Sequence, residues 1–206
     1  KRDQASRIYE MADRLRDKHG LDCACMLTER PGSATEIART LAESGEEVRI
    51  YACGGDGTIH EVANGVAGYS NAAMTCIPTG TGNDFLKNFG PDLEKFSDAE
   101  NLWDGDVFPI DLIDCNGDIS LNICSVGLDA RIAADVAGYK RIPLLQGFRA
   151  YAASTVVNVV KGIAEHYTVE LGGKRFDEEF TFICVCNGRF YGGGFKFLGV
   201  QLVGVA

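Results

Sequence analysis

Two glycine-rich loops constrain the fold of this chain more than any other feature of its sequence. The first has the sequence GGDGT at residues 54–58, and the second has the sequence PTGTGND at residues 78–84. Each loop follows a short apolar run that is typical of a buried β-strand, at residues 48–53 and 74–77, and each leads into a helical pattern. Because parallel strands present their carboxyl ends at one edge of a sheet, we expect the two loops to form a single crevice there.

A strand, a glycine turn and a helix N-terminus together form a place where a phosphate group can sit. The first turn of a helix has unpaired backbone N–H groups and a partial positive charge, and glycine lets the backbone approach closely. The loops match neither the P-loop pattern nor the GxGxxG pattern of dinucleotide-binding folds. Each loop instead contains a carboxylate, Asp56 or Asp84. Because Mg²⁺ is typically held by one or two carboxylates together with substrate phosphates, these two residues are the predicted metal ligands.

The composition argues against several other classes of protein. A net charge of −9 disfavours nonspecific binding to nucleic acid, and a hydrophobic fraction of 46% favours a folded core over disorder. The sequence contains no run of about 18 apolar residues that would span a membrane, and no secretory signal at its start. The eight cysteines lie mostly in apolar runs without metal-binding spacings, so we expect buried, reduced thiols in a reducing cytoplasm.

The first half of the sequence alternates between helical and strand-like patterns. Residues 7–18 carry a helical apolar stripe, and residues 21–27 have the pattern of a strand. Capping-box patterns at residues 33–36 and 58–61 predict the starts of two further helices. This alternation is typical of a parallel α/β layer, and because the chain starts with a helix, we expect that an earlier strand is missing.

The character of the sequence changes after a polar, acidic connection, and we place a domain boundary near Asp106. This gives an α/β domain at residues 1–106 and a β-rich domain with inserted helices at residues 107–206, which we expect to be incomplete. The predicted elements of the second domain are hairpins at residues 110–125 and 167–187 and helices at residues 128–136 and 147–164.

The second of these helices lies in a basic and apolar stretch. Residues 136–164 contain no acidic residue and four basic ones, Lys140, Arg141, Arg149 and Lys161. Contact with an anionic membrane surface is one interpretation of this pattern. The other is that the valines at positions 156, 157, 159 and 160 bury the helix in the core while its basic residues face water.

Four motifs, in this order along the chain, resemble those of the diacylglycerol kinase catalytic domain family. They are GGDGTIHEVANG at residues 54–65, PTGTGND at residues 78–84, NICSVGLDA at residues 122–130 and NGRFYGGGF at residues 187–195. The soluble bacterial lipid kinases of this family are the most similar. Sphingosine and ceramide kinases share the same plan, and NAD kinases and 6-phosphofructokinases share the first motif more distantly.

The resemblance implies a fold, an activity and a location. The family has an N-terminal nucleotide-binding α/β domain of the NAD kinase and phosphofructokinase type, followed by a C-terminal β-sandwich, with the active site between them. It transfers the γ-phosphoryl group of ATP to a lipid hydroxyl with Mg²⁺. We therefore expect an ATP-dependent lipid kinase whose substrate is a membrane lipid such as diacylglycerol. We expect it in the cytoplasm, peripherally associated with the inner face of the membrane, and we keep a second copy of the chain, in a homodimer, as a further partner.

The resemblance also assigns roles to residues of the two loops. Asp56 and Asp84 would act on the metal–triphosphate side, and Asn83 would bind the nucleoside end. Thr58 and Glu61 would support the first loop, and a helix cap is the alternative role for both. The residues that would contact the phosphates of ATP are Gly54, Gly55, Gly57, Gly80 and Thr81.

The two later motifs would serve the acceptor. Asp129 would face the lipid headgroup and orient its hydroxyl, and would complete a catalytic set with Asp56 and Asp84. The alternative is that Asp129 is the N-cap of the helix at residues 128–136. The glycines at residues 192–194 would shape the lip of the cleft or form a hairpin turn.

The chain departs from the family pattern at both ends. The family begins with a strand and an NPxSG turn, and it continues beyond the fourth motif with an acidic segment and a glutamate that serves as catalytic base; none of these is present here. No general base is therefore assigned. Two other functions stay open, namely a kinase for a soluble acceptor, as in NAD kinases, and a non-catalytic nucleotide or lipid sensor.

Overall fold

The computed structural model describes residues 2–139, 148–191, 195–196 and 201–204 of the chain. These residues belong to two compact units, and each is described by itself. The first unit is an α/β domain, and the second contains an antiparallel sheet and two helices. The first unit comprises Lys1–Asn122 and Asn187–Phe197, and the second comprises Ile123–Cys186 and Leu198–Ala206.

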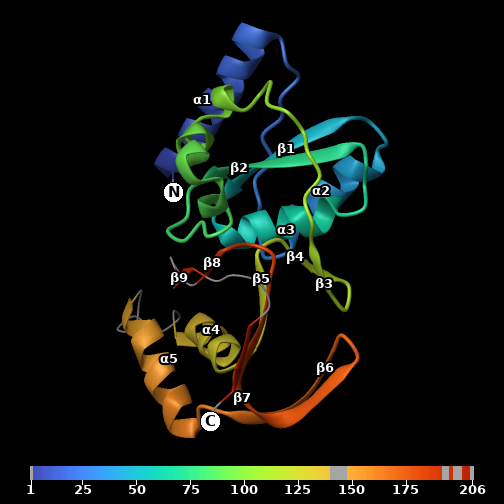
Figure 1. The fold of residues 1–206 in the computed structure, drawn as a ribbon. Coiled ribbons are helices and arrows are strands. Elements are labelled where there is room, and N and C mark those ends of the chain that lie inside the picture. The colour runs from blue at the N-terminus through green and yellow to red at the C-terminus, as the bar shows by residue number, and fades with distance from the viewer. Residues whose placement is uncertain (1, 140–147, 192–194, 197–200, 205–206) are drawn as a thin grey trace. The chain divides into compact units, whose positions relative to one another are not determined.

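The first unit contains a parallel pair of strands, β1 (Val48–Gly54) and β2 (Ala72–Pro78). Figure 1 shows this sheet between helical layers, with α1 (Arg2–His19) on one face and α2 (Ser33–Glu43) and α3 (Asp56–Val66) on the other. The predicted α/β layer is therefore confirmed. Both strands and all three helices lie where the sequence patterns predict them.

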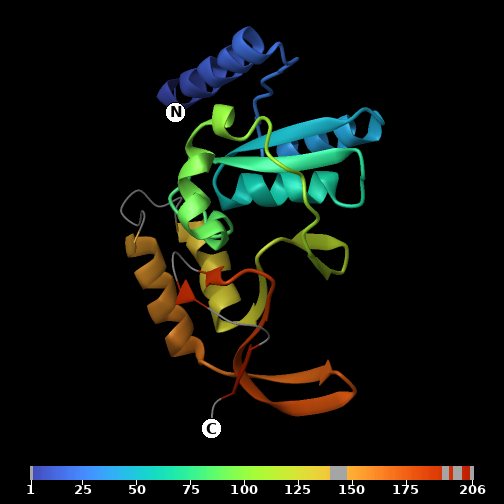
Figure 2. The ribbon, with the colours of Figure 1, turned by 45° about the horizontal axis from the view of Figure 1, so that its top comes forward.

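Successive residues of β1 and β2 pack into different apolar clusters, one on each face of the sheet. Ala52 and Cys76 pack with α2 and α3, whereas Tyr51 and Ile77 pack with Leu15 of α1. Figure 2 shows the pair of helices along one face of the sheet and α1 on the far side of it. Because successive residues of a strand point to opposite faces, a strand that is covered on both faces has a continuous apolar sequence.

Residues 21–27 do not form the strand that their pattern predicts. In the described structure they belong to no sheet, although their exposure alternates as it does in an extended chain. Leu21 and Cys23 pack against the apolar cluster that α1 forms on the sheet. A strand needs a neighbouring chain that supplies hydrogen-bond partners, and alternating side chains do not provide one.

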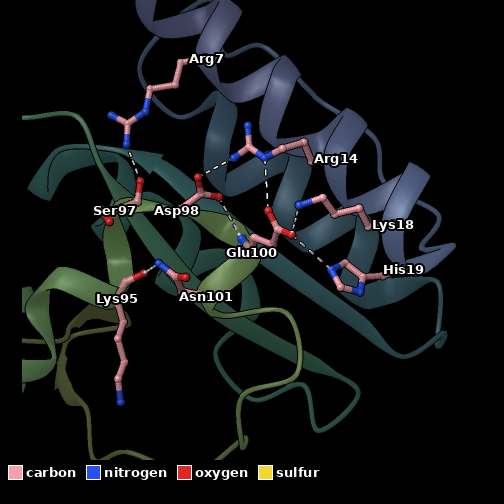
Figure 3. Close-up of polar contacts among 9 residues, drawn as sticks. All are labelled: Arg7, Arg14, Lys18, His19, Lys95, Ser97, Asp98, Glu100 and Asn101. Atoms are coloured by element: carbon pink, nitrogen blue, oxygen red, sulfur yellow. Dashed lines mark hydrogen bonds and ion pairs between the residues drawn. The ribbon is translucent and has the colours of Figure 1, made fainter.

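Two 3₁₀ helices follow β2, namely η1 (Leu86–Ser97) and η2 (Ala99–Asn101), and ion pairs attach α1 to Asp98 between them and to Glu100 of η2. Figure 3 shows basic side chains of α1 directed at carboxylates of this segment. Glu100 accepts hydrogen bonds from the Arg14 Nε at 3.3 Å and from the Lys18 Nζ at 2.6 Å. The amphipathic helix α1 thus has apolar contacts with the sheet and charged contacts with the connection that follows β2.

The predicted boundary near Asp106 lies inside the first unit. A short hairpin follows it, formed by β3 (Ile113–Cys115) and β4 (Asp118–Ser120). This hairpin packs on α3, where the Asn64 side chain accepts a hydrogen bond from the Ile119 N–H at 2.7 Å and donates one to the Ile119 carbonyl at 2.8 Å. The Asn64 amide thus pairs with the N–H and the carbonyl of one residue, as a neighbouring strand would. The hairpin is therefore part of the α/β unit.

The second unit is built around the long strand β7 (Lys174–Cys186). Its first half pairs with β6 (Glu165–Leu171), and its second half pairs with β5 (Ile123–Gly127) and β10 (Gln201–Gly204), all antiparallel. The predicted second hairpin is confirmed, and so are the two predicted helices. These helices are α4 (Leu128–Tyr139) and α5 (Phe148–Lys161). A second sheet packed on this one, as in the β-sandwich of the resemblance, stays a prediction.

Some predicted features lie outside the described residues. The strands β8 (Phe190–Tyr191) and β9 (Phe195–Lys196) pair with each other, but the glycines at residues 192–194 are not described. The same holds for Lys140, Arg141 and the side chain of Arg149.

The valines of α5 do not bury this helix as a group. Val156, Val159 and Val160 are exposed, so the interpretation that they face the core is wrong for these three residues. Within the described part of the chain, no helix combines the length and the hydropathy that crossing a bilayer requires.

All eight cysteines are free thiols in the structure. Cys115 is exposed, whereas the others are buried or half-buried. Burial raises the pKa of Cys53 to about 11 and that of Cys76 to about 12. These thiols therefore stay protonated near neutral pH and behave as small apolar side chains.

Candidate active site

The two glycine loops meet at the carboxyl ends of β1 and β2, as their positions in the sequence predict. The Thr79 N–H donates to the Gly54 carbonyl at 2.9 Å, which extends the hydrogen bonding of the sheet into the loops. Gly55 and Gly80 approach so closely that a Cβ atom on Gly80 would lie 2.6 Å from the Gly55 Cα. Glycine is therefore required at this contact.

Asp56 joins the first loop to the second. Its carboxylate accepts hydrogen bonds from the N–H groups of Asn83 at 2.8 Å and Asp84 at 2.7 Å. Asn83 has a left-handed backbone, with a φ of 51°, as in the turns whose successive N–H groups bind an anion. A Cβ atom on Gly82 would lie 2.5 Å from the same carboxylate. Asp56 is thus a brace between the loops, a structural task that the motif alone does not reveal.

Asp84 forms an ion pair with Lys87 in the segment after the second loop. Both side chains are mostly covered, with exposed fractions of 15% for Asp84 and 26% for Lys87. A lysine three residues after an aspartate is a common pairing in helical segments, so the sequence did contain a signal for this contact. Lys87, which the motifs do not include, is therefore a further charged residue of the candidate site.

The first loop leads into an α-helix, and the second does not. The helix α3 begins at Asp56 with Gly55 as its N-cap, and no side chain caps it. The second loop leads into η1, a 3₁₀ helix with a kink at Gly90 before Pro91. In the described structure, the uncapped N–H groups and dipole of an α-helix are therefore available for an anion at the first loop.

A pocket of about 350 Å³ opens beside the start of α3. A Cβ atom on Gly57 would meet nothing within 4 Å, so this glycine borders open space. The segment before α2 supplies the other wall. The residues that line the pocket are Thr28, Glu29, Arg30, Pro31, Ala34, Gly57, Thr58 and Glu61.

Glu61 connects α3 to the start of α2, and both predicted capping boxes are wrong. Its carboxylate accepts hydrogen bonds from the N–H groups of Gly32 at 3.0 Å and Ala34 at 3.1 Å, so it caps the neighbouring helix. The N-cap of α2 is Gly32, and Glu36 of the predicted box pairs with Arg30 at 2.7 Å. A capping box assumes a partner within one turn of the chain, whereas here the packing of two helices supplies a more distant one.

Five of the eight residues that line the pocket lie outside the four motifs, and Thr28 and Arg30 are two of them. Thr28 and Arg30 precede α2 and reach the first loop because α2 packs against α3. Glu36 holds the Arg30 guanidinium through both carboxylate oxygens, at 2.7 and 2.8 Å. Arginine often binds phosphate, but the distance along the chain from the glycine loops hid this signal.

The other predicted residues of the loops also have local contacts. The side chain of Thr58 lies over Gly54, where a Cβ atom would overlap it. Asn83 donates from Nδ2 to the Gly80 carbonyl at 2.9 Å, and its Oδ1 is buried without a hydrogen-bond partner among the described residues. Thr81 is exposed. Their roles in nucleotide binding stay predictions.

Asp129 lies in the second unit, inside the first turn of α4. This helix begins at Leu128, so the interpretation of Asp129 as its N-cap is wrong. The Cys184 thiol donates to the Asp129 carboxylate at 3.9 Å. Burial, followed by this negative charge, raises the pKa of the thiol to about 12. The role of Asp129 toward an acceptor stays a prediction.

Three asparagines hold the start of the fourth motif to the first unit. The Asn122 carbonyl accepts hydrogen bonds from the N–H groups of Asn187 and Gly188, both at 2.8 Å. The Asn88 Oδ1 accepts one from the Arg189 N–H at 2.7 Å. A Cβ atom on Gly188 would lie 1.7 Å from the Asn122 Oδ1, so this position requires glycine. The start of the third motif and the segment after the second loop are thereby joined to the fourth motif.

The carboxylates of the site fit a metal ion that arrives with a ligand. The described residues contain no group of three or more His, Cys, Asp or Glu side chains that could enclose a metal ion. Asp56 and Asp84 offer two carboxylates, and both oxygens of the Asp56 carboxylate already accept backbone hydrogen bonds. This donor set fits Mg²⁺ that keeps phosphate and water ligands, and does not fit a cage of protein side chains.

The paired glycine loops and the carboxylate brace between them define the candidate site, and comparison with known proteins defines the family of the chain. The sequence model described as "Diacylglycerol kinase catalytic domain" matches residues 2–115, which is more than half of the chain. The chain therefore belongs to the diacylglycerol kinase catalytic domain family.

Similar proteins are longer than this chain. A Pseudomonas aeruginosa protein named "Probable lipid kinase YegS-like" is 30% identical over 176 residues, which are 85% of this chain and 57% of that protein. A Staphylococcus aureus protein named "Putative lipid kinase SaurJH9_0749" is 32% identical over 70% of this chain and 47% of its own length. A crystal structure from Bacillus anthracis, titled as that of "a putative diacylglycerol kinase", has a TM-score of 0.60 and 26% identity, and covers 82% of this chain and 56% of the other. This chain thus spans about half the length of these relatives.

Proposed function

We propose that this protein is an ATP-dependent lipid kinase, which transfers the γ-phosphoryl group of ATP to the hydroxyl group of a lipid such as diacylglycerol. The observation that carries the proposal is the Asp56 brace, which joins two glycine loops beside a pocket of about 350 Å³ at the uncapped start of α3. Family membership and the names of the relatives support a lipid as the acceptor.

The pocket beside α3 is the proposed site of the triphosphate. The backbone N–H groups at the start of α3 donate to phosphate oxygens, and Thr58 adds a hydroxyl group. Gly57 leaves the approach to this backbone open. Arg30, held by Glu36, supplies positive charge from the other wall of the pocket.

Asp56 and Asp84 would hold Mg²⁺ on the protein side of the triphosphate, where the bound ion neutralises charge on the phosphoryl oxygens. Asp56 also keeps the second loop against the first, so that the donors of both loops are aimed at one place before the ligand arrives. Phosphoryl transfer depends mainly on such positioning and charge neutralisation. Each well-placed donor contributes on the order of 10²–10³-fold in rate.

The proposal is tested by phosphorylation assays with labelled ATP and Mg²⁺ in mixed micelles. The acceptors are diacylglycerol, ceramide and sphingosine, with NAD as the soluble acceptor. We expect label in one of the lipids. The substitution Asp56→Asn keeps the shape of the side chain but replaces one acceptor oxygen by a donor, which breaks one bond between the loops. We expect kcat to fall on the order of 10²–10³-fold.

The matched control is Asp92→Asn, because Asp92 is 60% exposed and pairs with Lys95 on the surface of η1. This variant is expected to keep the parent kcat. Label in NAD rather than in a lipid would indicate a kinase for a soluble acceptor. ATP binding without transfer to any of the four acceptors would contradict the kinase proposal and favour a nucleotide sensor.

A further inference from the structure

The side chain of Asn88, four residues after Asp84, forms hydrogen bonds with its own turn and with two distant segments of the first unit. Its Nδ2 donates to the Phe85 carbonyl at 2.8 Å and to the Asn122 Oδ1 at 3.2 Å. Its Oδ1 accepts from the Arg189 N–H at 2.7 Å. The first bond is local, but the other two reach residues that lie 34 and 101 positions farther along the chain. Asn88 therefore joins the segment after the second loop to the starts of the third and fourth motifs.

The distant partners of Asn88 are closely packed against each other. The Asn122 Nδ2 donates to the Phe190 carbonyl at 2.5 Å, and the Asn122 carbonyl accepts from the Gly188 N–H at 2.8 Å. A Cβ atom on Gly188 would lie 1.7 Å from the Asn122 Oδ1 and 2.8 Å from the Asn88 Nδ2. The backbone of the fourth motif thus lies directly against both side-chain amides, and a shift of either amide would shift this backbone.

The turn that carries Asn88 also carries Asp84, the predicted metal ligand of the second loop. The Asn88 N–H, like its side chain, donates to the Phe85 carbonyl, at 3.1 Å, which closes the turn next to Asp84. Leu86 of the same turn is fully buried, and Lys87 pairs with Asp84. Because close packing transmits small displacements, a displacement of Asn88 is expected to displace Asp84 as well.

We propose that Asn88 is a positioning residue, which keeps Asp84 in a fixed position relative to the start of the third motif and to the fourth motif. The inference rests on the proposed lipid kinase activity, in which the second loop serves the metal-bound triphosphate and the two later motifs serve the acceptor. Asn88 touches neither reactant and acts through the segments that it joins. Phosphoryl transfer needs the attacking and leaving oxygens in line, and a displacement of about 1 Å can lower such a rate on the order of 10²-fold.

The test compares Asn88→Ala with the parent in the phosphorylation assay, and measures ATP binding separately by titration calorimetry. The substitution leaves the Asp56 brace between the glycine loops intact, so the Kd for ATP is expected to stay at the parent value. The kcat is expected to fall about tenfold or more, because donor and acceptor are then less well aligned. Circular dichroism checks the fold. If Asn88→Ala unfolds, Asn88→Asp replaces it, with an expected loss of kcat in the same direction.

The matched control for a simple loss of stability is Asn71→Ala. The Asn71 amide donates to the carbonyls of Ala42 and Glu46 at 2.9 and 2.8 Å, at the other end of β2. Asn71 is half-buried whereas Asn88 is exposed, so Asn71→Ala should lower stability at least as much. Its kcat is nevertheless expected to equal that of the parent, because its amide contacts neither glycine loop nor the later motifs.

The double variant Asn88→Ala/Asn122→Ala tests whether the two amides act as one link. If they do, the double variant loses little more kcat than the more affected single variant, whereas the losses of independent residues multiply.

Hydrogen exchange examines the link without ATP or a lipid. The Arg189 N–H is expected to exchange slowly in the parent and faster in Asn88→Ala, since its acceptor is then absent. Absence of lipid phosphorylation by the parent would contradict the lipid kinase proposal alone, because this exchange measurement needs no acceptor.

Four results would overturn the proposal. One is an equal loss of kcat in Asn71→Ala and Asn88→Ala, which would indicate a general loss of folded enzyme. Another is a rise in the Kd for ATP that accounts for the whole loss in Asn88→Ala, which would make Asn88 part of the nucleotide site. The third is a double variant whose loss is the product of the two single losses. The fourth is unchanged exchange of the Arg189 N–H in Asn88→Ala.

Discussion

The helices α3 and α5 place their polar residues in opposite ways. In α3, Ile59 and Val62 are buried against the sheet, and the polar residues reach outward to neighbouring segments. In α5, Ser154 and Asn158 are buried, and valines are exposed. Both helices satisfy their polar groups, because Glu61 caps α2 and Asn158 binds Asp135 of α4.

The comparison teaches that the position of a polar residue depends on where its hydrogen-bond partners lie. A buried amide is tolerated when it is fully bonded and is unfavourable when it is not. The helix α3 has the usual amphipathic pattern, so its buried face was evident in the sequence. The buried face of α5 is set by the carbonyl and carboxylate groups of α4, and hydropathy alone points to the opposite face.

The largest effect on stability is expected at the crossing of α2 and α3. A Cβ atom on Gly65 would lie 2.5 Å from the Ala38 Cβ and 2.8 Å from the Thr35 carbonyl. The substitution Gly65→Ala would therefore push the two helices apart and lower the free energy of unfolding by about 1–3 kcal/mol. Urea denaturation measures this change.

The control for this substitution is Gly57→Ala at the other end of the same helix. A Cβ atom on Gly57 meets nothing within 4 Å, and alanine favours the helix, so stability is expected to stay equal or to rise by about 0.5–1 kcal/mol. Because Gly57 lines the pocket, its substitution should nevertheless weaken ATP binding. Equal destabilisation by both substitutions would contradict the distinction between a packing glycine and a binding glycine.

A second prediction tests directly whether the polar face of α5 is the buried one. Asn158→Ala removes the donor to Asp135 and to the Ser154 carbonyl, and is expected to lower the free energy of unfolding by about 1–3 kcal/mol. Val160→Gln, on the exposed face, is expected to change it by less than about 0.5 kcal/mol. The same denaturation measurement compares the two, and a larger loss for Val160→Gln would show that the valine face is the buried one.

The smallest effect is expected at the surface contact between α1 and η2. The hydrogen bond from Lys18, and then that from Arg14, lower the pKa of Glu100 from its usual value of 4.5, against the effect of burial. A carboxyl group with a lowered folded-state pKa stabilises the fold above its unfolded pKa, and this contribution is lost as the pH falls through the folded value. Glu100→Gln should therefore flatten the loss of stability in thermal unfolding below about pH 4.

Glu170→Gln is the control for this pH dependence, because Glu170 is 73% exposed and lies on the hairpin of the second unit. Its melting temperature should follow that of the parent at every pH. If Glu100→Gln also follows the parent, the charged contacts of α1 do not contribute to its attachment.

The features that the sequence predicted correctly depend on residues that are close together in the chain. The apolar runs of β1 and β2 and the two helices of the second unit lie where their patterns indicate. Gly172 and Gly173 adopt positive φ values of 57° and 76° in the turn between β6 and β7, as a two-glycine hairpin requires. The meeting of the two glycine loops was also predictable, because parallel strands end at one edge of a sheet.

The features that only the tertiary structure decided depend on residues that are far apart in the chain. The sequence pattern predicted that Glu61 caps its own helix, α3. Because α2 packs on α3, Glu61 instead caps the start of α2. The first unit extends beyond the boundary expected at Asp106, because the side chain of Asn64 on α3 forms hydrogen bonds with the backbone of Ile119. Thr28 and Arg30 entered the candidate site for the same reason, since the folding of α2 onto α3 brings them to the pocket. Hydrogen bonds and burial are properties of pairs of surfaces, and a sequence pattern describes only one surface of each pair.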